Sequence, residues 1–132
     1  MTSNARRSVA SPFLKVPGST QVVAMLADKW SIPVIHSLAR GTKRTGVLRR
    51  ELAGVSQKML TQTLRRLEKR GLVERIVFPV IPPRVEYRLT MLGESINEPL
   101  ARLCEWTEQH GAVLEQTLGP ARRRSARSRR SD

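Results

Sequence analysis

The sequence predicts a mainly α-helical protein with one small β-hairpin, an α+β fold. Three observations lead to this class. Apolar residues recur at helical spacing before residue 71 and again after Thr90. Two short stretches, 72–78 and 84–89, alternate in the manner of strands, and three prolines fall between them. At 132 residues the chain is one domain plus tails, with room for one modest core.

The amino-terminal part predicts an arm followed by two helices. Residues 1–18 are rich in Ser, Pro, Gly and Arg without a sustained period, which favours a flexible arm. Helices are expected over 19–27 and 31–40, each beginning with a serine that we expect to cap it, and Gly41 closes the second. Trp30 is expected to anchor the core rather than to stack on a ligand.

Two further helices form a helix-turn-helix pattern. A helix is expected over 46–52, followed by a tight turn over 53–55 and a basic helix over 56–70. Ser56 is the expected N-cap of the basic helix, and Gly71 supplies a left-handed stop after it.

The helix over 56–70 has two different sides. Its apolar side carries Leu60, Leu64 and Leu67. Its other side carries Lys58, Thr61, Gln62, Arg65 and Lys69. An alternative interpretation is a merely solvated basic face. Polar residues that cluster at the N-terminal end, few local counter-charges and the hairpin that follows favour a DNA-reading helix instead.

The hairpin predicts a stiff wing beside that helix. Pro79, Pro82 and Pro83 cannot donate to a ladder, so they belong in a loop or at an exposed edge. There they would hold Arg84 where it meets phosphate or the minor groove. Alternatively, Pro82 and Pro83 only block edge-to-edge aggregation.

In these segments the chain resembles the HxlR-type branch of the MarR-like winged helix-turn-helix transcription regulators. The similarity runs from about Ser19 to His110. It is carried by DKW at 28–30, LRREL at 48–52, GVSQKMLT at 54–61, LRRL at 64–67, GLVER at 71–75 and VIPPRVEYRLT at 80–90. The resemblance implies a dimeric repressor or activator that binds inverted repeats, with helices outside the winged domain that dimerise. Thr45 and Gly46 depart from the family pattern just before the LRREL segment.

The expected DNA contacts follow from this arrangement. The N-terminal half of the helix over 56–70 enters the major groove, and the wing over 79–84 lies on the backbone or in the minor groove. The expected DNA-binding residues are Arg49, Arg50, Ser56, Gln57, Lys58, Thr61, Gln62, Arg65, Arg66 and Arg84. Among these, residues 57, 58, 61 and 62 would read bases, and residues 65 and 66 would hold phosphate. Arg49 and Arg50 would instead pair with Glu51 or Glu68 in the alternative interpretation.

Charge is unevenly distributed along the chain. The net charge is +13, of which residues 40–90 contribute +9 and residues 120–132 contribute +5, whereas residues 91–119 carry −4. A basic reading unit followed by an acidic segment predicts a polyanion binder with a separate face that does not touch DNA.

The carboxyl-terminal part predicts a long amphipathic segment after Thr90, which Pro99 should kink or interrupt near Asn97. Its apolar sides favour a homodimer through the N-terminal and C-terminal helices, although they could instead fold back on their own core. The winged domain is expected over 19–118 and a disordered arginine-rich tail over 119–132. The alternative function is therefore a nonspecific DNA- or RNA-binding architectural protein driven by that tail.

Other classes of function find little support in the sequence. His36 and His110 do not have metal-ligand spacing, and no glycine-rich phosphate loop is present, so we expect neither an enzyme nor a cofactor. Cys104 is expected to be a buried small hydrophobe rather than a redox sensor, and one cysteine excludes an internal disulfide. No membrane span or secretory signal is evident, so a cytoplasmic location is expected. A small-molecule effector is possible, but no residue set nominates one.

The sequence thus predicts a sequence-specific, homodimeric transcription regulator that binds double-stranded DNA at a pseudo-palindromic operator.

Overall fold

The computed structural model describes residues 15–119. The expected arm lies mostly outside these residues, and the expected arginine-rich tail lies outside them except for Gly119. The chain divides into two compact units, one ending at Asn97 and one beginning at Glu98.

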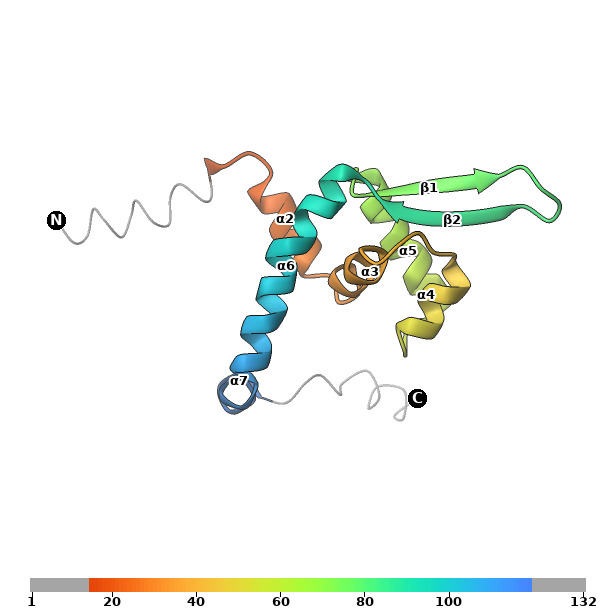
Figure 1. Ribbon diagram of the computed structural model, residues 1–132. Helices are drawn as coiled ribbons and strands as arrows, with labels where there is room; N and C mark the ends of the chain where they lie inside the picture. Colours follow the sequence, from red (N-terminus) through yellow and green to blue (C-terminus); the bar gives the residue numbers. More distant parts are fainter. Residues whose placement is uncertain (1–14, 120–132) are drawn as a thin grey trace, which may run out of the picture. The chain divides into compact units, whose positions relative to one another are not determined.

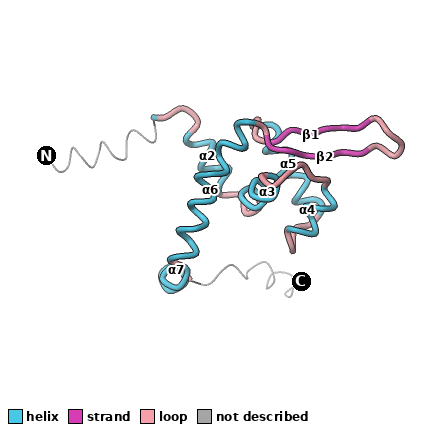
Figure 2. The backbone as a smooth tube through the Cα atoms, viewed as in Figure 1, coloured by secondary structure: helices cyan, strands magenta, loops and turns pink. Residues whose placement is uncertain are grey.

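The first unit contains the helix-turn-helix and the hairpin (Figure 1). Its elements are α2 (Ser19–Leu26), α3 (Ser31–Leu38), α4 (Thr45–Glu51), α5 (Gln57–Lys69), β1 (Val73–Phe78), β2 (Arg84–Leu89) and the first turns of α6 (Met91–Gln109). Helices predominate, and the far end of the hairpin projects beyond them in Figure 2. The predicted class, mainly α with one small β-hairpin, is confirmed.

The core of this unit is apolar and joins α3, α4, α5 and the hairpin. The three leucines of α5 are buried, as their helical spacing predicted. They are enclosed with Val34, Ile35, Leu48, Val73, Tyr87 and Leu89. Since these leucines fix one side of α5 inward, its opposite side is turned to solvent.

The hairpin is antiparallel and runs in register from the pair Val73 and Leu89 to the pair Phe78 and Arg84. The sequence did not indicate a further strand-like contact beside it. Lys43 forms an isolated antiparallel bridge with Tyr87, through hydrogen bonds of 2.9 Å from its amide and 2.8 Å to its carbonyl. The segment that leads into α4 is therefore fastened to β2.

The helix starts confirm one predicted cap and correct two others. Ser56 caps α5, because its hydroxyl accepts a hydrogen bond of 3.1 Å from the amide of Met59. Ser19 and Ser31 are instead the first residues of their helices, which begin after Gly18 and Trp30 without a side-chain cap. Both helices also end earlier than predicted, at Leu26 and Leu38.

The start of α6 is locked onto the turn that follows α5. The hydroxyl of Thr90 accepts from the amide of Gly93 at 3.1 Å and donates to the carbonyl of Gly71 at 2.6 Å. A Cβ on Gly93 would collide with the carbonyl of Leu72. Only glycine allows this close approach of helix and turn.

The second unit contains the rest of α6 and α7 (Gly111–Leu118). Pro99 was predicted to kink or interrupt the segment near Asn97, and the interruption does not occur, because α6 continues through Pro99. Ser95, whose carbonyl loses its usual partner four residues on, is exposed, so water can satisfy it. Cys104 is exposed rather than buried, because every residue of α6 from Arg102 to Gln109 is exposed in this single chain.

None of the helices formed by residues 15–119 is long and apolar enough to span a lipid bilayer.

Candidate nucleic-acid interface

Helix α5 presents a continuous polar surface. Gln57, Lys58, Gln62, Arg65 and Lys69 are exposed, and Thr61 is half-buried beside them. The amide Nε2 of Gln57 donates to the hydroxyl of Thr61 at 3.3 Å. Ser56 is also exposed, but its hydroxyl oxygen is occupied by the cap. The residues predicted to read bases therefore share one accessible surface at the N-terminal half of the helix.

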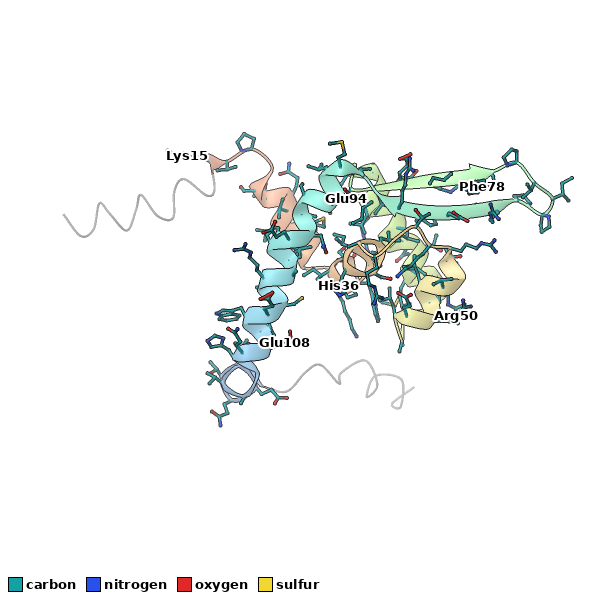
Figure 3. The ribbon with its side chains drawn as sticks, in the orientation of Figure 1. Lys15, His36, Arg50, Phe78, Glu94 and Glu108 are labelled. Carbon is teal, nitrogen blue, oxygen red and sulfur yellow. The ribbon has the colours of Figure 1, made fainter. Side chains whose placement is uncertain are left out.

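The arginines of α4 extend this surface. Arg49 and Arg50 are exposed, and neither has an ion pair within residues 15–119. The suggested pairing of either arginine with Glu51 or Glu68 is therefore absent from the described part of the chain. Figure 3 labels Arg50 on α4 and Phe78 at the end of β1.

Glu51 instead forms hydrogen bonds and ion pairs with residues that precede α4 in the chain. Its carboxylate accepts from Ser37 at 2.5 Å, Lys43 at 2.7 Å and Arg40 at 2.9 Å. The hydrogen bond from Lys43, followed by that from Ser37, lowers the pKa of Glu51 from its ordinary 4.5 to about 2. This network joins α3, the segment before α4 and the end of α4, and it leaves Arg49 and Arg50 free of Glu51.

Arg66 has a different environment from Arg65. Its guanidinium donates to the Asp28 carboxylate at 2.7 Å. The same carboxylate accepts from Ser31 at 3.1 Å and, at 3.5 Å, from Thr63. We call these four residues the Asp28 cluster. It fastens α5 to the turn between α2 and α3, so Arg66 braces the helix, although its side chain is still half exposed.

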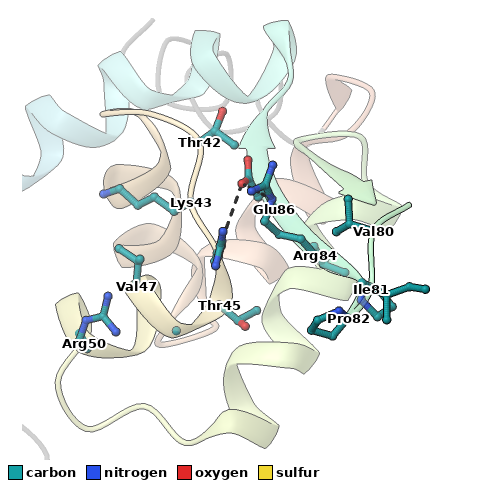
Figure 4. Close-up of a pocket in the computed structure, with 14 residues that line it drawn as sticks. Thr42, Lys43, Thr45, Val47, Arg50, Val80, Ile81, Pro82, Arg84 and Glu86 are labelled. Carbon is teal, nitrogen blue, oxygen red and sulfur yellow. Dashed lines mark ion pairs between the residues drawn. The ribbon is translucent and has the colours of Figure 1, made fainter. Parts of the chain in front are cut away.

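Arg84, the arginine predicted to act from the wing, is held in place by its neighbours. Its guanidinium carbon lies 4.3 Å from the centre of the Phe78 ring, and its Nε lies 3.3 Å from the Glu86 carboxylate. Arg44, which the sequence did not single out, approaches the same carboxylate at 3.9 Å. Figure 4 labels Arg84 and Glu86 and marks ion pairs with dashed lines. Arg44 and Glu86 are far apart along the chain, so no local pattern in the sequence indicated this contact.

These side chains border an open groove of ≈ 1100 Å³ between α4 and the hairpin (Figure 4). The groove is lined by residues 42–47, Arg50 and residues 80–86. We call it the α4–wing groove. All of it belongs to the first unit.

Much of the basic charge in the first unit has no acidic partner. Within residues 15–119, no ion pair engages Arg49, Arg50, Lys58, Arg65, Lys69, Arg70 or Arg75, and all seven are exposed. A surface with this excess attracts polyanions, since phosphate contacts release the counterions condensed on DNA. No group of three or more His, Cys, Asp or Glu that could hold a metal occurs in the described ranges.

Comparison with known proteins gives one consistent family. Residues 25–115 match the family model described as HxlR-like helix-turn-helix. The HTH-type transcriptional regulator YtfH of Escherichia coli K12 is 44% identical over 90 residues, which cover 68% of this chain and 71% of that protein.

Solved structures agree with that match. The transcriptional regulator YtfH from Salmonella typhimurium is 41% identical and superposes with a TM-score of 0.67, covering 75% of this chain and 89% of that one. A MarR-family transcriptional regulator from Enterococcus faecalis V583 is 38% identical with a TM-score of 0.62, covering 77% and 96%.

Proposed function

The chain belongs to the HxlR-like helix-turn-helix family, and from this premise we propose that it is a transcription regulator that binds DNA sequence-specifically as a homodimer. One observation carries the proposal. The buried leucines of α5 turn its polar side outward, beside the free arginines of α4. That arrangement fits a recognition helix in the major groove, with the preceding helix across the backbone.

We assign base reading to Gln57, Lys58, Thr61 and Gln62. Glutamine and lysine side chains recognise adenine and guanine edges in the major groove. Arg65 lies on the same exposed side and is the phosphate contact of the helix, whereas Arg66 acts mainly through Asp28. Arg49, Arg50 and Arg84 supply further phosphate contacts, and Ser56 sets the helix start.

We place the regulator domain at 19–118 and assign dimerisation to the N-terminal and C-terminal helices. Exposed apolar residues support this assignment: Val22 and Val23 on α2, and Leu103, Trp106, Val113 and Leu118 on α6 and α7. A second copy of the chain would cover them. Two-fold symmetry would then require a pseudo-palindromic operator with half-sites about 34 Å apart, one helical turn of DNA.

The alternative, an architectural protein driven by the arginine-rich tail, is not favoured by membership of a regulator family.

Selection of bound duplexes from random DNA tests the proposal. The purified protein is expected to enrich an inverted repeat at physiological salt. Enrichment of no motif would overturn sequence specificity, and enrichment of a single half-site would overturn the symmetric dimer.

Two variants of α5 distinguish a base contact from a phosphate contact. Gln62→Ala is expected to cost about 1–3 kcal/mol on the selected duplex only, because it removes a base contact. Arg65→Ala is expected to weaken all duplexes and to flatten the slope of log affinity against log salt by about one unit. Fluorescence anisotropy titrations at several salt concentrations measure both. Equal losses on selected and random DNA for both variants would contradict the assignment of Gln62.

A further inference from the structure

We propose that the α4–wing groove holds a single strand of the DNA backbone, with its phosphates on Arg44, Arg50 and Arg84 and its sugars against the tip of the wing. This inference rests on the proposed function. It adds a contact residue, Arg44, and an apolar contact surface to it.

The charge of the groove favours a phosphate ligand. Glu86 is the acidic residue of its lining, and its carboxylate is shared between Arg44 at 3.9 Å and Arg84 at 3.3 Å. Arg50 has no ion pair in the described residues, and Lys43 is occupied by Glu51. The lining therefore contains three guanidinium groups and one carboxylate. Their planar forks match phosphate oxygens and lose little water on binding.

Arg84 is arranged in advance for such a contact. The Phe78 ring supports its guanidinium. Its Nε is buried and, although it lies 3.3 Å from the Glu86 carboxylate, forms no hydrogen bond within residues 15–119. The side chain as a whole is nevertheless 41% exposed, so its accessible surface lies away from Nε. A guanidinium already held in place loses less conformational freedom when it binds.

The tip of the wing adds apolar surface to the groove. Val80 is half exposed and Ile81 fully exposed, and Pro82 and Pro83 follow them. Prolines fix the backbone and offer no amide donors. Such a surface suits the apolar face of a sugar and offers little to a free ion. Arginines from both sides of the groove and an apolar wing tip together correspond to the phosphates and sugars of a nucleic-acid strand.

The openness of the groove favours a polymer over a small molecule. Small-molecule sites are usually concave pockets of ~300–1,000 Å³ that bury most of the ligand. This groove, at ≈ 1100 Å³, is at the upper end of that range, but it is open, and Ile81 in its lining is fully exposed, so a small ligand would stay largely in solvent. A nucleic-acid strand that runs through the groove and continues at both ends fits this open shape.

A test combines protein variants with duplexes in which single phosphates are replaced by neutral methylphosphonates. The duplex is the one obtained by selection from random DNA. Neutralising a phosphate held in the groove should weaken the wild-type protein by about fivefold, the upper range for an exposed ion pair. Arg44→Ala and Arg84→Ala should each become insensitive to the same phosphate or to its neighbour on that strand. Lys58→Ala is the matched control and should retain the full loss at that position.

The inference would be overturned if the Arg44 and Arg84 variants lost sensitivity to phosphates on different strands. It would also be overturned if Arg44→Ala lost sensitivity to no phosphate. The proposed function would survive that result if Gln62→Ala still altered sequence preference. It would fail separately if no variant distinguished the selected duplex from random DNA. Circular dichroism and thermal unfolding of each variant verify that the fold is retained.

A second measurement tests the apolar wing tip. Ile81→Glu places a carboxylate against the expected strand and should weaken binding to any duplex at least tenfold. Val77→Glu, at a half-exposed position of β1 outside the groove lining, adds the same charge and should have a smaller effect. Equal losses would overturn the placement of the strand. Competition by inorganic phosphate at equal ionic strength to chloride should be absent; specific competition would instead identify the groove as a site for free anions and overturn the inference.

Discussion

Glu51 shows how one carboxylate can leave neighbouring arginines exposed by pairing with other residues. It gathers Ser37, Arg40 and Lys43 on the inner side of α4, so that Arg49 and Arg50 remain on the outer side. The sequence placed Glu51 next to these two arginines and suggested a local pair. The contact that forms is with residues 8 to 14 positions away, which local spacing cannot reveal.

We expect the stability contribution of Glu51 to depend on pH. Its pKa is about 2 in the folded protein and is expected to return to 4.5 on unfolding. A lowered folded pKa stabilises the fold above the unfolded pKa, and this stabilisation is lost as pH falls from 4.5 toward 2. Urea unfolding of wild type and Glu51→Gln should therefore give midpoints that differ most near pH 7 and converge below pH 3. A difference that does not change with pH would contradict this. Glu98→Gln, which removes an exposed i,i+4 pair, is the control.

Gly93 is a second residue whose role is set by a single contact. Replacing glycine by alanine within a helix usually stabilises it by about 1 kcal/mol. At Gly93 the added methyl group would meet the Leu72 carbonyl, so we expect Gly93→Ala to destabilise the protein by about 1–3 kcal/mol. Gly46→Ala is the matched control, since only the end of the Arg50 side chain lies near it. Chemical denaturation compares the two, and a stabilised Gly93→Ala variant would show that the helix start shifts freely.

Among the elements, α5 and the hairpin were largely predictable. The leucine spacing, the Ser56 cap and the Gly71 stop are all local, and local patterns survive in the fold because packing agrees with them. The bridge between Lys43 and Tyr87 was not predictable, since one pair of residues leaves no periodic signal. For the same reason Arg44 was missed as part of the candidate site.

Arg66 illustrates a partial signal. It follows Thr63 by three residues, which places both on the flank of the leucine stripe rather than on the fully exposed side. Asp28 and Ser31, which are also three residues apart, lie against this flank of α5, where the Asp28 carboxylate accepts from Ser31 and Thr63. These two spacings together could have indicated a contact between the elements, but their separation along the chain hid it.

The Asp28 cluster predicts a change in affinity without a change in preference. Asp28→Asn removes the charge that holds Arg66, so α5 should be less firmly seated on α3. We expect binding to weaken by a similar factor on selected and random duplexes, together with a lower thermal unfolding midpoint. Anisotropy titrations on both duplexes measure this effect. Arg70→Gln removes a charge from the end of α5 that has no ion pair in residues 15–119 and serves as the control. A changed ranking of sequences for Asp28→Asn would contradict the bracing role.

At the scale of the whole molecule, the exposed apolar side chains of the second unit lead to a prediction about assembly. Val113 on α7 is more than half exposed. If a second copy covers it, Val113→Glu must bury a carboxylate, and we expect the dimer to dissociate at a concentration roughly 100-fold higher. Gln116→Glu adds the same charge to the same helix and should have little effect. Sedimentation velocity over a range of concentrations distinguishes them, and an unchanged Val113→Glu dimer would exclude this surface.

For the second unit, the sequence indicated the amphipathic and acidic character of the helices better than it indicated their extent and exposure. Its acidic, amphipathic character was evident, but the continuity of α6 through Pro99 and the exposure of Cys104 were not. Both occur where α6 extends beyond the core of its own chain, with residues 102–109 exposed all round, and a single sequence does not specify how far a helix extends in this way.

The turn between α2 and α3 carries a consequence for how such a protein diversifies. The Asp28 carboxylate contacts α5 at Thr63 and Arg66, which are not among the residues proposed to read bases. If α5 reads bases as proposed, substitutions there are expected to change the strength of DNA binding while the preferred motif stays the same. Selection can therefore adjust how often a gene is silenced or switched on without first inventing a new target.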